Sequence, residues 1–231
     1  MTIVTSLDEA VALLYGASRR AGPLSGELRI WHRRTDKDDG PSEVRWRVVQ
    51  DGPRYRWQLV SHDPGTRRRA SVPPELLVGD GVRAWTRRGD RIVASAYDGC
   101  LLADQMLDPS WLLARYQLDV TGRADREGRP VFTLSGQRKP VRQGAQYVHE
   151  AVEAIVDTQR GFLHQLTSLK DGETFEVIEL CHLRLDDQPD DAAFTAPVGG
   201  APTRDAALRP RAPGRRRRGH EAEHRRDASP T

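Results

Sequence analysis

Apolar and polar residues alternate along several stretches of the chain, and this period of two is typical of half-buried β-strands. The clearest example covers two neighbouring stretches in which every second residue is apolar: Val44, Trp46 and Val48, then Tyr55, Trp57 and Leu59. The residues between them include four arginines, Arg45, Arg47, Arg54 and Arg56. Because antiparallel strands present one face to a core and the other to water, we expect the two tryptophans to point inward and the arginines outward.

The stretch 147–194 predicts three more antiparallel strands, over residues 149–157, 162–169 and 174–185. The first turn between them begins after an Asp and the second contains Asp-Gly, and these residues tolerate the backbone angles of hairpins. Shorter alternating runs predict strands over 24–33, 91–96, 116–122 and 130–135, and the Asp80-Gly81 turn leads into a further strand that ends at Trp85. The sequence therefore predicts a mainly β, α+β fold.

Two stretches break the alternation and predict helices. Ser6 and Glu9 form a capping box, and apolar residues follow at helical spacing up to the stop at Gly22-Pro23: Leu7, Ala10, Val11, Leu14 and Tyr15. Residues 100–107 and 109–114 predict two short helices. Asp108 is the expected N-cap of the second, and Pro109 stands in its first turn.

Charge separates the end of the chain from the rest. From residue 197 onward nine arginines face four acids, whereas the remainder of the 231 residues carries 27 basic and 29 acidic groups. The pI of about 9.1 therefore describes the tail. Residues 198–231 contain several Pro and Gly and the run Arg215–Arg218, and they cannot bury an apolar face. We expect one domain over 1–197 and a disordered Arg-rich tail over 198–231.

Residues with chemistry are few. No nucleophile elbow, phosphate loop or dinucleotide fingerprint is present, so we expect neither an enzyme nor a cofactor. Cys100 and Cys181 lie outside any C-x-x-C pattern, which leaves a disulfide between them open and gives no support for a metal. A metal site is also not supported by His164 and His182, in adjacent predicted strands, or by the acidic cluster within 186–191.

The chain as written shows no export signal. Its first six residues have neither a basic nor an apolar region, and no window approaches the roughly 18 apolar residues of a membrane span. We therefore expect a cytoplasmic protein, exported only if the start is misassigned.

The closing strands resemble the C-terminal sheet of the LolA-like half-barrels. The resemblance rests on Asp157, Gly161-Phe162-Leu163, a Leu-x-Ser-Leu strand, an Asp-Gly turn, a long strand ending Leu185-Asp186-Asp187 and a final Asp-x-x-x-Phe. It covers roughly residues 5–197. The superfamily includes LolA-type and LolB-type lipoprotein carriers, LppX-like lipoproteins and RseB/MucB regulators. It implies a curved antiparallel half-barrel with an N-terminal helix and a short helical lid.

The resemblance also implies a binding site inside the curve. Its predicted wall consists of Trp46, Trp57, Trp85, Met106, Leu107, Trp111 and Leu112, with Trp85 at the family's aromatic position. This wall would bind an apolar or acylated ligand or a lipoprotein-like partner without catalysis, unless the lid helices simply fill the space as an ordinary core.

An alternative comes from a different class of function. The chain would then be a regulatory interaction module whose tail, through Arg215, Arg216, Arg217 and Arg218, contacts nucleic acid or an acidic partner. The four arginines on the outward side of the strands admit two interpretations, a phosphate-binding face or a solvated face.

Overall fold

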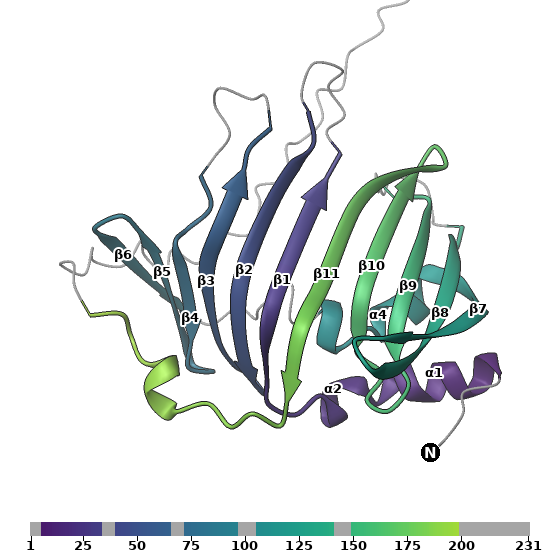
Figure 1. The fold of residues 1–231 in the computed structure, drawn as a ribbon, viewed down its shortest axis with the longest axis horizontal. Helices are drawn as coiled ribbons and strands as arrows, with labels where there is room; N and C mark the ends of the chain where they lie inside the picture. The colour runs from purple at the N-terminus through teal and green to yellow at the C-terminus, as the bar shows by residue number, and fades with distance from the viewer. Residues whose placement is uncertain (1–5, 34–39, 66–71, 97–104, 141–148, 199–231) are drawn as a thin grey trace, which may run out of the picture.

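The strands form a single open antiparallel sheet in the order β6-β5-β4-β3-β2-β1-β11-β10-β9-β8-β7 (Figure 1). The computed structural model describes residues 6–33, 40–65, 72–96, 105–140 and 149–198. One half consists of β1 (Leu24–His32), β2 (Ser42–Asp51), β3 (Arg54–Asp63), β4 (Leu76–Gly79), β5 (Arg83–Arg88) and β6 (Arg91–Ala96). The other half consists of β7 (Tyr116–Arg126), β8 (Arg129–Arg138), β9 (Ala151–Asp157), β10 (Leu163–Lys170) and β11 (Glu173–Leu185). Each half is a meander, and the last strand returns to pair with the first at the centre of the sheet.

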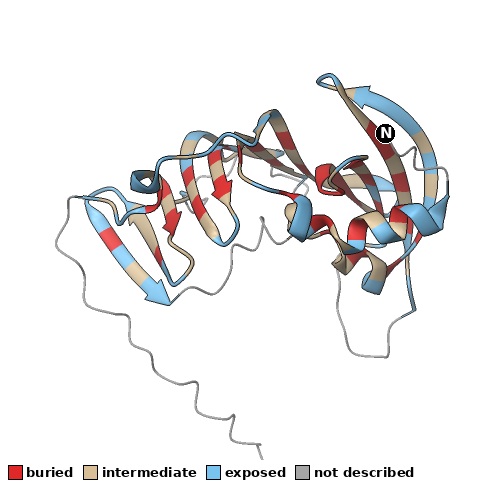
Figure 2. Cartoon of the chain, turned by 90° about the horizontal axis from the view of Figure 1, so that it is seen from below, coloured by how far each residue is buried: buried red, intermediate tan, exposed pale blue. Residues whose placement is uncertain are grey.

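Short helices cover one face of this curved sheet. They are α1 (Leu7–Tyr15), α2 (Ala17–Arg20), a helical turn at 105–107 and α4 (Trp111–Arg115). Both α1 and α4 contact β7, so they lie over the half that contains β7–β11, inside the curve (Figure 2). A 3-10 helix, η1 (Asp191–Phe194), follows β11. The predicted mainly β half-barrel with a helical cover is confirmed, and the sheet is not closed.

Several predicted boundaries are corrected. The N-terminal helix has the predicted capping box between Ser6 and Glu9, but it ends at Gly16, where a residue of low helix propensity separates α1 from α2. Leu7 and Tyr15 are exposed although the sequence placed them on the buried face, and Tyr15 is 76% exposed. The N-cap of α4 is Ser110 and not Asp108, whose carboxylate accepts a hydrogen bond from the Ser110 backbone N–H.

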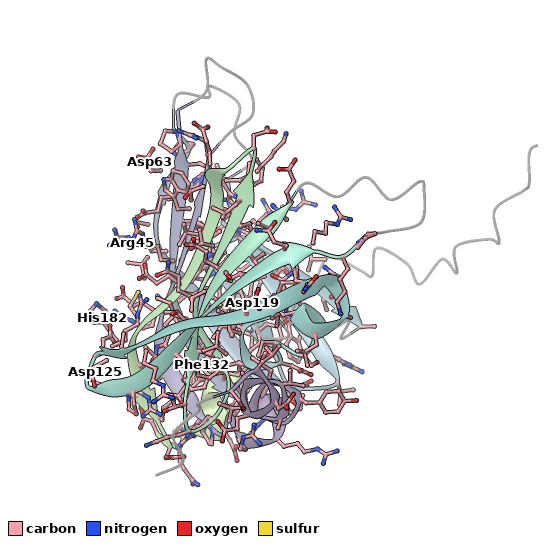
Figure 3. The ribbon with its side chains drawn as sticks, turned by 90° about the vertical axis from the view of Figure 1, so that its right-hand side faces the viewer. Arg45, Asp63, Asp119, Asp125, Phe132 and His182 are labelled. Atoms are coloured by element: carbon pink, nitrogen blue, oxygen red, sulfur yellow. The ribbon has the colours of Figure 1, made fainter. Side chains whose placement is uncertain are left out.

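The turn expected before the strand of Trp85 is present, and in it the Asp80 carboxylate accepts hydrogen bonds from the backbone N–H groups of Val82 and Arg83, 2.7 Å each. One strand prediction differs from the structure. The β7–β8 hairpin is longer than predicted and runs to Arg126 and Arg129. Figure 3 shows this hairpin crossing the edge of the sheet, with Asp125 near its tip on the side of His182.

The face against the helices, called the inner face below, carries the main core. Cross-strand register places one apolar row on it from β2 to β7: Val44, Ile30, Ile178, Leu166, Ala154, Leu134 and Val120. Ala10 and Leu14 of α1 and Leu112 of α4 are fully buried in the same cluster. The predicted inward direction of Trp46 and Trp57 is confirmed, since both belong to this cluster and are about 5% exposed or less.

The opposite, outer face has a smaller apolar contact with η1, near the end of the described residues. Phe194 of η1 is 2% exposed, and the Arg54 guanidinium lies 4.7 Å from its ring centre. Arg54 also pairs with Asp191 at 2.6 Å, and Arg56 donates a hydrogen bond to the Ala193 carbonyl at 3.3 Å. Two of the four outward arginines are therefore occupied by the segment that follows β11.

A buried polar cluster joins the ends of β8, β9 and β10. Asp157 and His164 are fully buried, and the Asp157 carboxylate accepts a hydrogen bond from Arg129 at 2.8 Å and from the backbone N–H groups of Gln159 and Arg160. His164 Nε2 lies 3.5 Å from the same carboxylate. Burial alone raises the pKa of Asp157, but the His164 and Arg129 contacts outweigh it and leave that pKa well below its usual range.

Candidate functional site

The inner face brings together six of the seven apolar residues predicted for the binding wall. Trp46, Trp57, Met106 and Leu112 are buried in its core cluster, and Leu107 and Trp111 pack against that cluster while partly buried. The seventh, Trp85, is separated from them. It pairs with Val78, which pairs with Arg56, and this register puts Trp85 on the outer face. The placement of Trp85 beside the other tryptophans is therefore corrected.

The apolar part of the inner face is almost filled by its own side chains. A hollow of about 20 Å³ remains between the sheet and the helical turn at 105–107, and its lining is Leu24, Leu28, Val48, Gln50, Trp57, Met106, Leu107 and Leu180. This volume holds about one water molecule. Gln50 is the polar group of the lining, and its Oε1 has no hydrogen-bond partner among the described residues. An apolar ligand needs Met106 to move before it can occupy this place.

A larger pocket of about 310 Å³ lies at the end of the same face, beside α4. Its volume is at the lower end of the roughly 300–1,000 Å³ of ligand pockets. The lining is Gln105, Trp111, Ala114, Arg115, Tyr116, Arg138, Lys139, Pro140, His149, Leu166, Ser168 and Glu176. Trp111 is the predicted wall residue in this set, and the polar members were not predicted from the sequence.

The polar lining follows from the strand register. Two residues further along each strand from the apolar row, a second cross-strand row lies on the inner face: Leu118, Gly136, Val152, Ser168, Glu176, His32 and Ser42. The row is apolar on β7–β9 and polar from β10 to β2. Because side chains alternate with a period of two, Glu176 shares its face with Ile178 and Leu180. A carboxylate in this inward position is the sequence signal that identifies the polar pocket.

Charged groups are concentrated in this pocket. Glu176 is paired with His32, whose Nδ1 lies 3.1 Å from the carboxylate. The His149 ring centre lies 5.3 Å from that of Phe175 with the two rings tilted, and its buried Nδ1 has no hydrogen-bond partner within the described part of the chain. Burial lowers the pKa of His149, and the Glu176 carboxylate acts in the opposite direction. Burial also raises the pKa of the Tyr116 hydroxyl.

The remaining sequence candidates are not assembled into a site. His164 is buried beside Asp157, whereas His182 is exposed and its backbone N–H donates to Glu127 on the β7–β8 turn. The acids after β11 have structural partners, since Asp186 pairs with Arg160 and Asp190 caps η1. Within the described ranges no group of three His, Cys, Asp or Glu residues could hold a metal.

Cys181 is a free, half-buried thiol, and burial raises its pKa to about 11. Cys100 and the predicted tail contacts Arg215, Arg216, Arg217 and Arg218 lie outside the described residues. None of the described helices has the length and apolar character needed to cross a membrane.

Comparison with known proteins adds information on the fold. No family profile and no curated protein matches the sequence. An uncharacterised conserved protein from Thermus thermophilus is 12% identical, with a TM-score of 0.51 over 82% of this chain and 94% of that protein. MucB is 20% identical, with a TM-score of 0.48 over 83% of this chain and 63% of MucB, so the chain spans less than two thirds of MucB.

A LolA superfamily protein from Nitrosomonas europaea is 13% identical, with a TM-score of 0.36 over 84% of this chain and 99% of that protein. At these identities the likenesses concern the fold alone. Of these, the likeness to the Thermus thermophilus protein has a TM-score above 0.5 and extends over most of both chains, so it shows that the fold occurs in a second protein.

Proposed function

We propose that this chain is a noncatalytic binding protein whose inner face accepts an apolar or acylated group, either free or attached to a lipoprotein-like partner. The observation that carries the proposal is the position of residues 105–111, called the lid segment below. Gln105 and Trp111 line the 310 Å³ pocket, and Met106 and Leu107 line the small apolar hollow. Displacement of this one segment would join the two hollows along the inner face.

The hydrogen bonds of the lid segment favour such a displacement. Those that the structure describes stay within the lid or its helix: Trp111 Nε1 donates to the Gln105 carbonyl at 3.0 Å, and the Ser110 N–H donates to Asp108 at 3.3 Å. The segment is held to the sheet through apolar side chains. An acyl chain can replace such contacts, because burial of apolar surface depends on area and not on direction.

The end of α4 is fixed more firmly than the lid segment. Lys139 Nζ donates to the Leu113 carbonyl at 2.7 Å, and the Lys139 backbone N–H donates to the Arg115 carbonyl at 3.0 Å. We therefore place the hinge of the opening at α4, with the lid segment as the moving part.

Quenching of tryptophan fluorescence by a brominated fatty acid tests the proposal, because bromine quenches only tryptophans close to the bound chain. Trp57 is on the inner face and Trp85 on the outer face, which makes the Trp85→Phe variant a matched control for Trp57→Phe. We expect Trp57→Phe to remove much of the quenchable emission and Trp85→Phe to leave it intact.

Equal losses in the two variants would place the ligand elsewhere, and an absence of quenching in the wild type would remove the proposal. Native mass spectrometry of freshly purified protein gives a second readout, since a bound lipid adds its mass to that of the chain.

A further inference from the structure

We propose that the 310 Å³ pocket is an anion subsite, which holds the carboxylate or phosphate group of the ligand while the apolar part lies under the lid segment. The inference rests on the proposed function and extends it by naming the polar end of the ligand. Its ligand class is an anionic amphiphile.

The charges of the pocket favour an anion. Arg115, Arg138 and Lys139 line it, against one carboxylate among the described lining residues, that of Glu176. The Glu176 carboxylate lies 3.1 Å from His32 Nδ1, so one hydrogen-bonding direction of this carboxylate is already used inside the protein. A cationic ligand would meet three cations, whereas an anion would reduce their mutual repulsion in a partly desolvated space.

The donors are held at the edge of the pocket by neighbouring groups. The Arg115 guanidinium lies 5.3 Å from the centre of the Trp111 ring, which orients its planar group. Lys139 uses one of its three N–H donors for the Leu113 carbonyl. Arg138 lies on the inner face because it pairs with Tyr116 across β7 and β8. Arginine and lysine are the side chains that recognise carboxylate and phosphate through charge-assisted hydrogen bonds.

His149 adds a group whose hydrogen bonding is incomplete. Its buried Nδ1 has no partner in the described structure, and a buried polar atom without a partner is destabilising. An anion in the pocket would accept a hydrogen bond from this nitrogen once it carries a proton. The site therefore has an unsatisfied polar group as well as an excess of positive charge.

The apolar lining sets the direction of the ligand. Trp111 and Leu166 line the same pocket as the cations, and Leu166 belongs to the apolar row of the inner face. Trp111 is also the last residue of the lid segment. An anionic group at Arg115 and Arg138 would therefore direct an attached chain along the inner face and under the lid segment.

A titration of the full chain with four probes tests the inference: decanoate, decyl phosphate, decanol and inorganic phosphate, at constant ionic strength. We expect the two anionic amphiphiles to bind at least about tenfold more tightly than decanol, because hydrogen bonds to charged groups are individually worth about that factor or more. In the Arg115→Gln/Arg138→Gln variant this preference should disappear while decanol binding is retained. Arg83→Gln/Arg91→Gln, with both residues exposed on β5 and β6 at the opposite end of the sheet, removes the same number of charges and should keep the preference.

The outcomes separate this inference from the proposed function. Equal affinities for decanol and decanoate, unaffected by Arg115→Gln/Arg138→Gln, would overturn the anion subsite and leave the proposed function standing. Binding of inorganic phosphate alone, lost in Arg115→Gln/Arg138→Gln, would support the anion subsite, identify a free anion as its occupant and contradict the proposed function. A loss of preference in Arg83→Gln/Arg91→Gln equal to that in Arg115→Gln/Arg138→Gln would overturn the subsite, because a general charge effect would then explain it.

Discussion

If the lid segment and an acyl chain compete for the same place, a weaker lid must bind ligand more tightly. Met106 is the side chain to change, because it is 1% exposed and lines the apolar hollow with Trp57 and Leu180. Replacement of a buried Met by Ala typically destabilises a protein by about 2–5 kcal/mol. Because Met106 is buried only while the lid is closed, Met106→Ala destabilises the closed state and leaves the open state unchanged. The population of open protein therefore rises.

The size of the effect follows from a two-state opening. Apparent affinity scales with the fraction of binding-competent protein, and about 1.4 kcal/mol corresponds to a factor of ten. At the lower limit of about 2 kcal/mol, Met106→Ala should bind a fatty acid up to about thirtyfold more tightly while the lid remains mostly closed in the absence of ligand. Stability and affinity should therefore change in opposite directions.

The assay combines a fatty-acid titration with amide hydrogen exchange. We expect faster exchange within 105–115 in the variant and tighter binding in the titration. Val131→Ala is the control: Val131 is 2% exposed but belongs to the outer side of β8, outside the inner-face cluster, so its replacement lowers stability without opening the lid. If Met106→Ala unfolds more easily and its affinity is unchanged, the ligand does not take the place of Met106 and the competition is refuted.

Three more predictions concern other parts of the chain. The pKa of Asp157 is lower in the folded than in the unfolded state, so its contribution to stability is present above the unfolded pKa of about 4 and is lost as the pH falls toward the folded pKa. Asp157→Asn should therefore weaken the acid dependence of stability. In urea titrations at pH 7 it should lower the unfolding free energy by about 3–5 kcal/mol. A chain that ends at residue 189 should melt at a lower temperature than one that ends at 198, because it lacks Phe194 and because loss of a buried Phe is destabilising by about 3–5 kcal/mol; equal melting temperatures would contradict the role of η1. Any retention of the protein on immobilised DNA should disappear when residues 198–231 are removed, and retention that survives the deletion would instead implicate the sheet.

Most of the fold could be predicted because its signal is local. The alternation around Trp46 and Trp57, the capping box at Ser6 and the Asp-Gly turn before β11 each specify their own element within a few residues. The division of the N-terminal helix at Gly16 was missed because a single Gly is only weakly unfavourable within a helix, and tertiary contacts decide whether the helix continues.

The face of Trp85 could not be predicted for a different reason. A turn at Asp80 separates β4 from β5, and alternation determines a face only within one uninterrupted strand. The outer face of β3 is contacted by η1, which lies far along the sequence. No local pattern shows that a strand is covered on that side.

The polar pocket could have been predicted in part. Alternation alone puts Glu176 on the same side as Ile178, so a carboxylate on the apolar side of β11 was visible in the sequence. Its neighbours were not visible, because Ser168 and His32 are brought to Glu176 by strand pairing. Arg115 and His149 come from segments beyond the strands, and their position depends on tertiary contacts with Lys139 and Phe175 that no local pattern shows.

The binding energy that a ligand needs sets a lower limit on the length of its chain. Opening the lid segment exposes Met106, Leu107 and Trp111, and each large apolar side chain is worth about 1.5–3 kcal/mol when buried. Burial of an acyl chain contributes about 0.8 kcal/mol per methylene, so about 6–11 buried methylenes compensate for the free-energy cost of opening. Fatty acids shorter than this should bind only weakly, through the anion subsite, and longer ones should gain about fourfold in affinity per methylene in the same titration. In Met106→Ala the minimum chain length for tight binding should fall by a few methylenes, because one of the three side chains no longer opposes opening. A minimum chain length that stays the same would show that chain length and lid opening are not linked.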